Sequence, residues 1–411
     1  MDPVLLGVFV AVYVGMMLGR VPGLRIDRTG IALLGAIVLL ASGRIDTATA
    51  WAAIDAPTLG LLIALMVLSA QLRLGGFYTA ITVRLARSAA SPERLLGQLV
   101  AVVGLLSAVL VNDVICLAIA PVLIDVCARR GLDPVPFLLT LAAAANVGSA
   151  ATLIGNPQNM LIGQSLGLDF FVHSSIALPP TIAGLALTWW LACRTWRGRF
   201  QRTISPPVIA LRSFDGWQTG KGLALLLVLV VAFVTAPLPR EILALTVAGL
   251  LLLSRRLHSR EMLGLVDWQL CVLFAGLFIV HAAFARTSAT HDALESLRDG
   301  GFDLESPAAL FGASVVLSNL VSNVPAVMLL LPAATDPLAG PVLALASTFA
   351  GNLLLVGSIA NLIVVEQAER FGVAPVSSGW FREHLRLGLP VTLGTLTIAA
   401  RWLAAIAPRP E

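Results

Sequence analysis

Apolar stretches of a length suited to crossing a lipid bilayer recur from one end of this sequence to the other. A helix needs about 20 apolar residues to cross a hydrocarbon core of about 30 Å. The charged fraction is 12%, roughly half of the about 25% that is usual in soluble domains. The sequence therefore predicts an all-α polytopic membrane protein, with expected spans that include residues 4–18, 30–42, 58–72, 176–193, 222–237, 242–254, 269–284 and 387–406.

The basic residues gather in short segments between these stretches. Between Arg194 and Lys221, six basic residues accompany one acidic residue, Asp215, so the positive-inside rule assigns this segment to the cytoplasm. In residues 286–306 the acidic residues outnumber two arginines, which suits the outer side. No aromatic-basic motif accompanies the net charge of +4, so we expect no nucleic-acid partner.

Two apolar segments have both of their flanks on one side. Residues 95–128 lie between Arg94 and Arg129, which predicts a re-entrant hairpin with its tip at Asn112 and Asp113. Residues 306–334 have the same length pattern, with a tip around Ser322 and Asn323 and both ends on the acidic side. A non-helical tip at membrane depth is tolerated only when it is buried in protein or lines a wet cavity.

The two hairpins belong to a weak internal repeat. Asp55 corresponds to Asp267, Asn112 to Asn323 and His173 to His384, with spacings of 212, 211 and 211 residues. Because the hairpins enter from opposite faces, we expect inverted repeats, a pattern of secondary transporters. The predicted layout has ten full spans, two hairpins and both termini outside. Its parts are N-terminal helices (1–54), a first repeat (55–194), a basic cytoplasmic loop (195–221), linking helices (222–266) and a second repeat (267–411).

Each repeat also contains a span that is broken at its centre. In residues 136–166 the break reads Gly-Asn-Pro-Gln-Asn, and Pro157 both lacks a backbone donor and disfavours helix at Asn156. The partner break, within residues 341–366, reads Gly-Ser-Ile-Ala-Asn from Gly357 to Asn361. The amino ends of half-helices suit an anion, whereas their carboxyl ends present carbonyls that suit Na⁺.

Polar residues at the tips and breaks form the predicted site. An intramembrane carboxylate is costly and marks ion pathways, which favours Asp113 as the coupling residue over a loop-capping role. For the amides and hydroxyls, hydrogen bonding within the protein and helix packing are the competing interpretations. The predicted substrate-binding residues are Asn112, Asn156, Gln158, Asn159, Ser322, Asn323, Ser358 and Asn361. The predicted ion-coupling residues are Asp113, Asn146, Ser149, Thr152, Thr348 and Asn352.

The sequence indicates no cofactor. The four cysteines lack metal-ligand spacing and are interpreted as small core residues, so we expect no metal site beyond Na⁺ in the case that Na⁺ and not H⁺ is the coupling ion. The sequence has no HExxH zinc motif, no Walker A loop and no Gly-x-Ser-x-Gly frame, so we expect no enzyme. The first apolar segment lacks a basic leader, which argues against a cleavable signal peptide. A single lysine among 27 basic residues suggests a GC-rich bacterial genome and a bacterial inner membrane.

The motifs VNDVICLAIAPVL, NVGSAATLIGNPQNMLI, SNVPAVMLLLP and GNLLLVGSIANLIV resemble, in that order, the ion transporter superfamily. This superfamily includes arsenite permeases, sodium/proton antiporters, citrate-transporter-like proteins and divalent-anion/sodium symporters. The resemblance implies an eleven-element inverted-repeat fold, usually homodimeric, with an elevator-like motion. Both hairpin tips of the dicarboxylate branch read Ser-Asn-Thr. The tips here, Val-Asn-Asp and Ser-Asn-Val-Pro, are nearer to the arsenite permease pattern.

Three functions remain open from the sequence. The first is a secondary transporter of a small inorganic or organic anion that is coupled to Na⁺ or H⁺ and works by alternating access. The second is a Na⁺/H⁺ antiporter centred on Asp113, or an arsenite efflux permease that could work with a separate ATPase subunit. The third is a non-transporting receptor or scaffold, against which stands the cost of two buried polar breaks.

Overall fold

The computed structural model describes residues 2–19, 23–88, 91–202, 212–287, 295–296, 298–375 and 379–407. Within these ranges the chain forms helices and no strand, apart from one isolated antiparallel bridge between Leu132 and Gln201. The predicted all-α class is confirmed. Of the predicted basic loop, residues 203–211 lie outside the described ranges.

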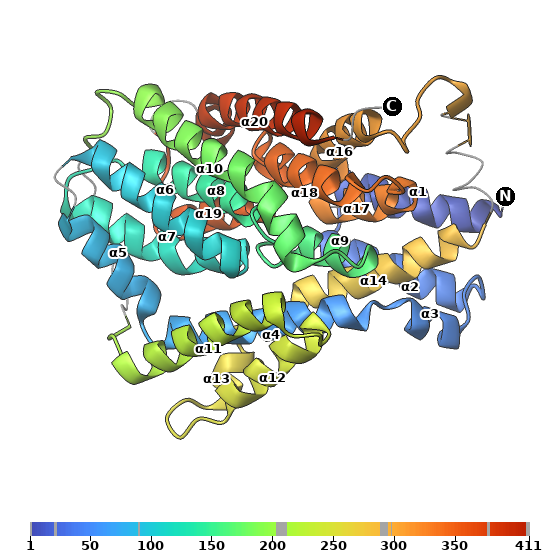
Figure 1. The fold of residues 1–411 in the computed structure, drawn as a ribbon, viewed down its shortest axis with the longest axis horizontal. Coiled ribbons are helices and arrows are strands. Elements are labelled where there is room, and N and C mark those ends of the chain that lie inside the picture. The colour runs from blue at the N-terminus through green and yellow to red at the C-terminus, as the bar shows by residue number, and fades with distance from the viewer. Residues whose placement is uncertain are drawn as a thin grey trace.

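The first ten helices lead up to and through the first predicted repeat (Figure 1). They are α1 (Pro3–Leu18), α2 (Arg28–Ala41), α3 (Thr47–Ala53), α4 (Ala56–Leu74), α5 (Phe77–Ser88), α6 (Pro92–Val109), α7 (Asn112–Arg129), α8 (Pro134–Ser149), α9 (Pro157–Ser165) and α10 (Phe170–Thr195).

The linking helices are α11 (Gly216–Thr235), α12 (Arg240–Leu252) and α13 (Ser259–Leu263). The second half contains α14 (Trp268–Ala285), α16 (Pro307–Val321), α17 (Asn323–Leu330), the 3₁₀ turn η1 (Leu331–Ala333), α18 (Ala339–Ala350), the 3₁₀ turn η2 (Leu355–Gly357), α19 (Ile359–Arg370) and α20 (Gly379–Ile406).

The order of elements in the first half recurs in the second. A long helix (α4 or α14) precedes a helical hairpin (α6–α7 or α16–α17), then an interrupted helix (α8–α9 or α18–α19), then a long final helix (α10 or α20). The two final helices pack against each other, α11 to α13 lie along α4, and α1 to α3 lie along α14 (Figure 1). Whether the halves have opposite membrane orientation stays a prediction.

Acidic and hydroxyl residues fix where most of these helices begin. Asp55, Asp133, Asp169 and Asp267 each accept a first-turn backbone N–H of α4, α8, α10 and α14. A side-chain cap of this kind contributes about 0.5–2 kcal/mol. Each of these ends therefore has a cap from its own chain.

Among the described residues, six helices are long and apolar enough to cross a membrane by length and composition: α4, α6, α10, α11, α14 and α20. The sequence prediction of ten full spans had counted α1, α2 and α12, and it had counted each interrupted helix as one span. At 1.5 Å per residue, the 16 residues of α1 and the 14 of α2 extend about 24 and 21 Å, short of a full hydrocarbon core.

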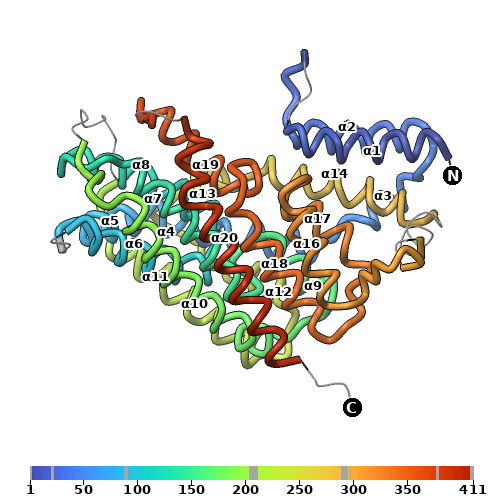
Figure 2. The backbone as a smooth tube through the Cα atoms, turned by 90° about the horizontal axis from the view of Figure 1, so that it is seen from above, coloured from blue at the N-terminus to red at the C-terminus, as the bar shows by residue number. Residues whose placement is uncertain are grey.

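Burial distinguishes the centre from the periphery. Every residue of α8 and α18 is buried, whereas α10, α11 and α20 expose large apolar side chains such as Trp190, Leu227 and Leu393. Helices α9, α17 and α18 contact one another near the middle of the molecule (Figure 2). The interrupted helices thus lie where lipid does not reach, and exposed apolar helices surround them.

Candidate functional site

The first break separates α8 from α9 over residues 150–156. Asn156 is extended (φ −151°, ψ 162°), as expected before Pro157, and its side chain caps α9 by accepting the Asn159 N–H at 2.8 Å. A Cβ at Gly155 would collide with the backbone of Ser149 and Ser107, so only glycine fits at this point of the break.

The second break separates α18 from α19 and contains η2. The Asn361 amide donates to the carbonyls of Gly351 (2.9 Å) and Leu354 (3.3 Å), which the break has freed. In the first break, Asn159 donates to the carbonyls of Ser149 (3.3 Å) and Thr152 (3.0 Å) in the same way. Each break is thus held by an asparagine three residues after the N-cap of the second half-helix.

Asn146 joins the two halves of the chain. Its Nδ2 donates to Oδ1 of Asn352 at 3.0 Å and to Oδ1 of Asn361 at 3.3 Å. Its Oδ1 accepts from Nδ2 of Asn112 at 3.2 Å and from Oγ of Ser358 at 2.9 Å. The tip of the first hairpin, the first interrupted helix and the second break therefore share one buried amide.

Thr348, at the carboxyl end of α18, makes a second set of bonds between the halves. Its Oγ1 accepts from the amides of Asn156 (3.1 Å) and Gln158 (3.3 Å) and donates to Oδ1 of Asn159 at 3.4 Å. Ser149 connects this set to the first, because its Oγ accepts from Asn156 and donates to the Asn146 carbonyl.

Asn323, at the tip of the second hairpin, completes the network. With its amide oriented to match its neighbours, its nitrogen donates to the Ser347 carbonyl at 3.1 Å, and its oxygen accepts from Gln158 at 3.2 Å. We call the joined residues the central network: Asn112, Asn146, Ser149, Asn156, Gln158, Asn159, Asn323, Thr348, Asn352, Ser358 and Asn361. All are buried.

Three predicted site residues have no side-chain bond to this network. Thr152 donates to the Ala108 carbonyl at 2.5 Å, which ties the break to the first hairpin. Ser322 is the one non-glycine residue with a positive φ (78°) in the described ranges, a strained backbone at the second tip. Asp113 is 7% exposed, and no described residue hydrogen-bonds or ion-pairs with its carboxylate.

Four helices begin at the central network, and they differ from the surrounding helices in their caps. Asn156 caps α9, but α7, α17 and α19 have no side-chain cap. Helices α12, α13 and α18 are also uncapped, at ends that lie away from the network. At α7 the Asn112 N–H donates to the Gly155 carbonyl at 3.0 Å. The other buried first-turn N–H groups of these uncapped ends leave donors and a partial positive charge in the interior.

His384 is a network neighbour that the site prediction omitted. Its Nε2 lies 2.9 Å from the Asn352 carbonyl, to which it donates. It therefore satisfies one more carbonyl of the second break. Its spacing from His173 was the available signal in the sequence, since both histidines occupy matching places in the repeat.

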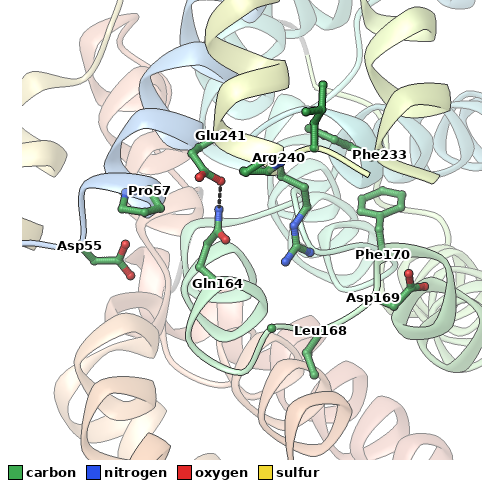
Figure 3. A pocket seen from close by; sticks show the side chains of 12 residues that line it. Asp55, Pro57, Gln164, Leu168, Asp169, Phe170, Phe233, Arg240 and Glu241 are labelled. Carbon is green, nitrogen blue, oxygen red and sulfur yellow. Dashed lines mark hydrogen bonds between the residues drawn. The ribbon is translucent and has the colours of Figure 1, made fainter. Parts of the chain in front are cut away.

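A cavity of about 450 Å³ lies where α9 ends and α4 and α12 begin (Figure 3). We call it the outer pocket, because the loop charges assign this side to the outside. Arg240 extends into it and donates to the Gly163 carbonyl at 2.8 Å, while Gln164 donates to Glu241 at 3.1 Å. Asp55 and Asp169 lie on its walls, so carboxylates outnumber guanidinium groups there.

The family model described as citrate transporter matches residues 13–350. The chain belongs to the citrate transporter family. This membership confirms the resemblance to the ion transporter superfamily, and the protein is a multi-pass membrane transporter.

Relatives agree with this assignment, and a solved structure has a similar fold. A Mycobacterium leprae protein named 46 kDa membrane protein is 30% identical, over 92% of this chain and 94% of its own. The silicon efflux transporter LSI3 of Oryza sativa subsp. japonica is 30% identical, over 91% of each chain. The fold resembles that of the Alcanivorax borkumensis YdaH transporter, with a TM-score of 0.60, 15% identity and coverage of 98% and 97%.

Proposed function

We propose that this protein is a secondary active transporter in a bacterial inner membrane, which carries a small inorganic or organic anion coupled to Na⁺ or H⁺ by alternating access. The observation that supports this most strongly is the meeting of uncapped amino ends in the central network. Amino ends of α7, α17 and α19 lack a cap there, whereas Asp or Ser residues cap most of the surrounding helices.

A bound substrate would accept hydrogen bonds from the free N–H groups at these helix ends. Each helix amino end carries a partial charge of roughly +0.5, and an anion is a natural partner for its free N–H groups. The network amides supply further donors, and their present bonds to one another would be exchanged for bonds to the substrate. Such an exchange costs little, because each donor keeps a partner in both states.

Asp113 is the proposed coupling residue. It is the second residue of α7, so it lies beside the same amino ends, and its carboxylate has no basic partner among the described residues. A proton or Na⁺ would neutralise it. The carboxyl ends of α6, α8, α16 and α18 directly precede the two tips and the two breaks in the chain and offer carbonyl oxygens, which are suitable Na⁺ ligands.

A neutral hydroxide substrate is the second candidate. No basic side chain belongs to the central network, so arsenite or silicic acid could use the same amides. The name of the rice relative, a silicon efflux transporter, favours this alternative. A Na⁺/H⁺ antiporter is the third candidate, and it would need Asp113 but no substrate at the helix ends.

A thermal-shift screen of the purified protein separates the three. The panel is sulfate, phosphate, succinate, citrate, arsenite and silicic acid, each in NaCl and in choline chloride. A ligand that binds the folded state raises the melting temperature with the logarithm of its saturation. We expect at least one anion to stabilise the protein and Asn323→Ala to remove that effect. Thr235→Ala, which loses a bond within the outlying α11, should keep it.

Other outcomes would replace the proposal. Stabilisation by arsenite or silicic acid alone would identify a transporter of neutral hydroxides. A response to Na⁺ with no response to any solute on the panel would favour the antiporter.

A further inference from the structure

A second cavity lies on the opposite side of the central network from the outer pocket. Its volume is about 410 Å³, and its walls come from the end of α4, the start of α5, the middle of α7 and the end of α19. We call it the inner cavity, because the arginine-rich segments assign this side to the cytoplasm. Arg73, Arg212 and Arg370 all line it.

The positive charge in this cavity is uncompensated. No acidic residue is among the described residues that line it, and none of its three arginines pairs with a described carboxylate. Arg212 is close enough to Arg73 for the two like charges to interact. Two arginines elsewhere on this face are paired: Arg129 with Asp125 at 2.8 Å and Arg202 with Asp133 at 3.5 Å.

Gln367 gives independent evidence for a ligand here. It lines the inner cavity, its exposed fraction is 6%, and its amide has no hydrogen bond to any described residue. Its amide atoms remain accessible from the cavity, so they can bond to a ligand that enters it. An anion held by the arginines would accept a hydrogen bond from this amide.

The inner cavity also leads toward the central network. Helices α7 and α19 start in the network and extend along the cavity. Asp113, Leu117 and Pro121 are spaced by four residues and therefore share one face of α7, and the last two line the cavity. Leu117 is five residues below Asn112, about 7.5 Å along the helix axis.

We propose that the inner cavity is an anion-binding vestibule, in which Arg73, Arg212, Arg370 and Gln367 hold a carboxylate, sulfate or phosphate group that enters from the cytoplasm. Its role as the loading point for transport rests on the proposed function. Its binding of an anion does not. A positively charged recess with low-dielectric walls raises the local concentration of anions before they reach the network.

Thiol-reagent rates test this proposal without any transport assay. The full-length protein carries Thr79→Cys at the cavity wall, with its four native cysteines replaced by alanine. We compare an anionic sulfonatoethyl methanethiosulfonate with its cationic trimethylammonioethyl counterpart. The anionic reagent should react faster, and Arg73→Gln with Arg370→Gln should lower the ratio of the two rates about tenfold. At constant ionic strength, sulfate should slow labelling, and the double substitution should remove this protection.

Two controls distinguish a folding defect from the loss of the anion-binding site. Leu238→Cys, on the wall of the outer pocket, should show an unchanged ratio in the double variant. Arg255→Gln, an exposed arginine of the same face, should leave the ratio at Thr79→Cys unchanged. Equal rates for both reagents, or no protection by sulfate, would overturn the proposal.

A lipid headgroup is the other source of the same anionic chemistry, and native mass spectrometry distinguishes it. If the protein retains a phospholipid that the double variant loses, and sulfate gives no protection, the cavity is a lipid site and the vestibule is rejected. If sulfate protects but no anion crosses the membrane in flux assays, the vestibule stands and the proposed transport function fails.

Discussion

The outer pocket and the inner cavity occupy matching places in the two halves of the molecule and carry opposite charge. The outer pocket lies where α9 ends and α4 begins, and the inner cavity lies where α19 ends, close to Leu265 before α14. Among the described lining residues, Asp55, Asp169 and Glu241 accompany one arginine in the outer pocket, whereas three arginines line the inner cavity. The recurring order of helices sets where the cavities lie, but single side chains set the charge.

This difference predicts a directional preference. An anion meets an attractive potential on the inner side and a repulsive one on the outer side, so the inner side should saturate at lower concentration. The charge difference should change how strongly each cavity attracts the anion. It should not change binding in the central network, which serves both cavities.

Removing the Asn146 side chain, which lies in the central network, should reduce transport from both faces, so that no difference between the two cavities can be measured. Asn146→Ala deletes four side-chain bonds to Asn112, Asn352, Ser358 and Asn361. We expect flux from both faces to fall more than about 100-fold and stability to fall by about 3 kcal/mol. Vesicle flux and denaturant melts measure the two effects. Asn319→Ala, which loses one bond to the Val315 carbonyl, is the matched control, and comparable losses in both variants would remove Asn146 from its central role.

Reversing one inner charge should act on one face only. Arg73→Glu should raise the half-saturating anion concentration about tenfold at the cytoplasmic face and leave the outer face unchanged. Inside-out and right-side-out vesicles measure the two faces separately, and Arg255→Glu is the control for total charge. An equal change at both faces would mean that Arg73 acts on the central network and not on capture.

Added salt should weaken anion binding in the inner cavity more than anion binding in the central network. The Debye length falls from about 10 Å at 0.1 M to about 3 Å at 1 M, so the exposed Arg212 and Arg370 should be screened strongly. We expect sulfate protection of Thr79→Cys to weaken several-fold over this range. Protection that does not change with salt would point to a binding site sealed from solvent.

The smallest of the predicted effects concerns the backbone at the two hairpin tips. Ser322 has φ 78° and ψ 160°, a region that essentially only glycine adopts, whereas Val111 at the first tip has φ −62°. Ser322→Gly should therefore raise stability by about 1 kcal/mol, and Val111→Gly should lower it by about the same amount. Denaturant melts of both variants measure this, and a loss of stability in Ser322→Gly would show that the serine side chain outweighs the strain.

The sequence predicted the interruptions well because their signals are local. Pro157 and Gly155 dictate the first break through their own backbone chemistry, and the structure has an interruption there. The predicted polar residues also come together, since 11 of the 14 join one network. Their roles in binding and coupling stay predictions.

The parts that the sequence did not predict depend on distant contacts. Arg73, Arg212 and Arg370 are far apart in the chain and share a cavity only because α4, α7 and α19 pack together. Thr152 donates to the Ala108 carbonyl of another helix, a contact between distant residues, and its role as an ion ligand stays a prediction.

The most direct test of anion transport is gradient-driven flux in proteoliposomes, with labelled sulfate, phosphate, succinate and citrate outside and an imposed Na⁺ or pH gradient. We predict that one of these anions accumulates above its equilibrium level only while the gradient lasts, and that Asp113→Asn abolishes accumulation but leaves anion exchange at equilibrium. Na⁺-dependent proton flux with no movement of any anion would contradict the account and make this protein an antiporter.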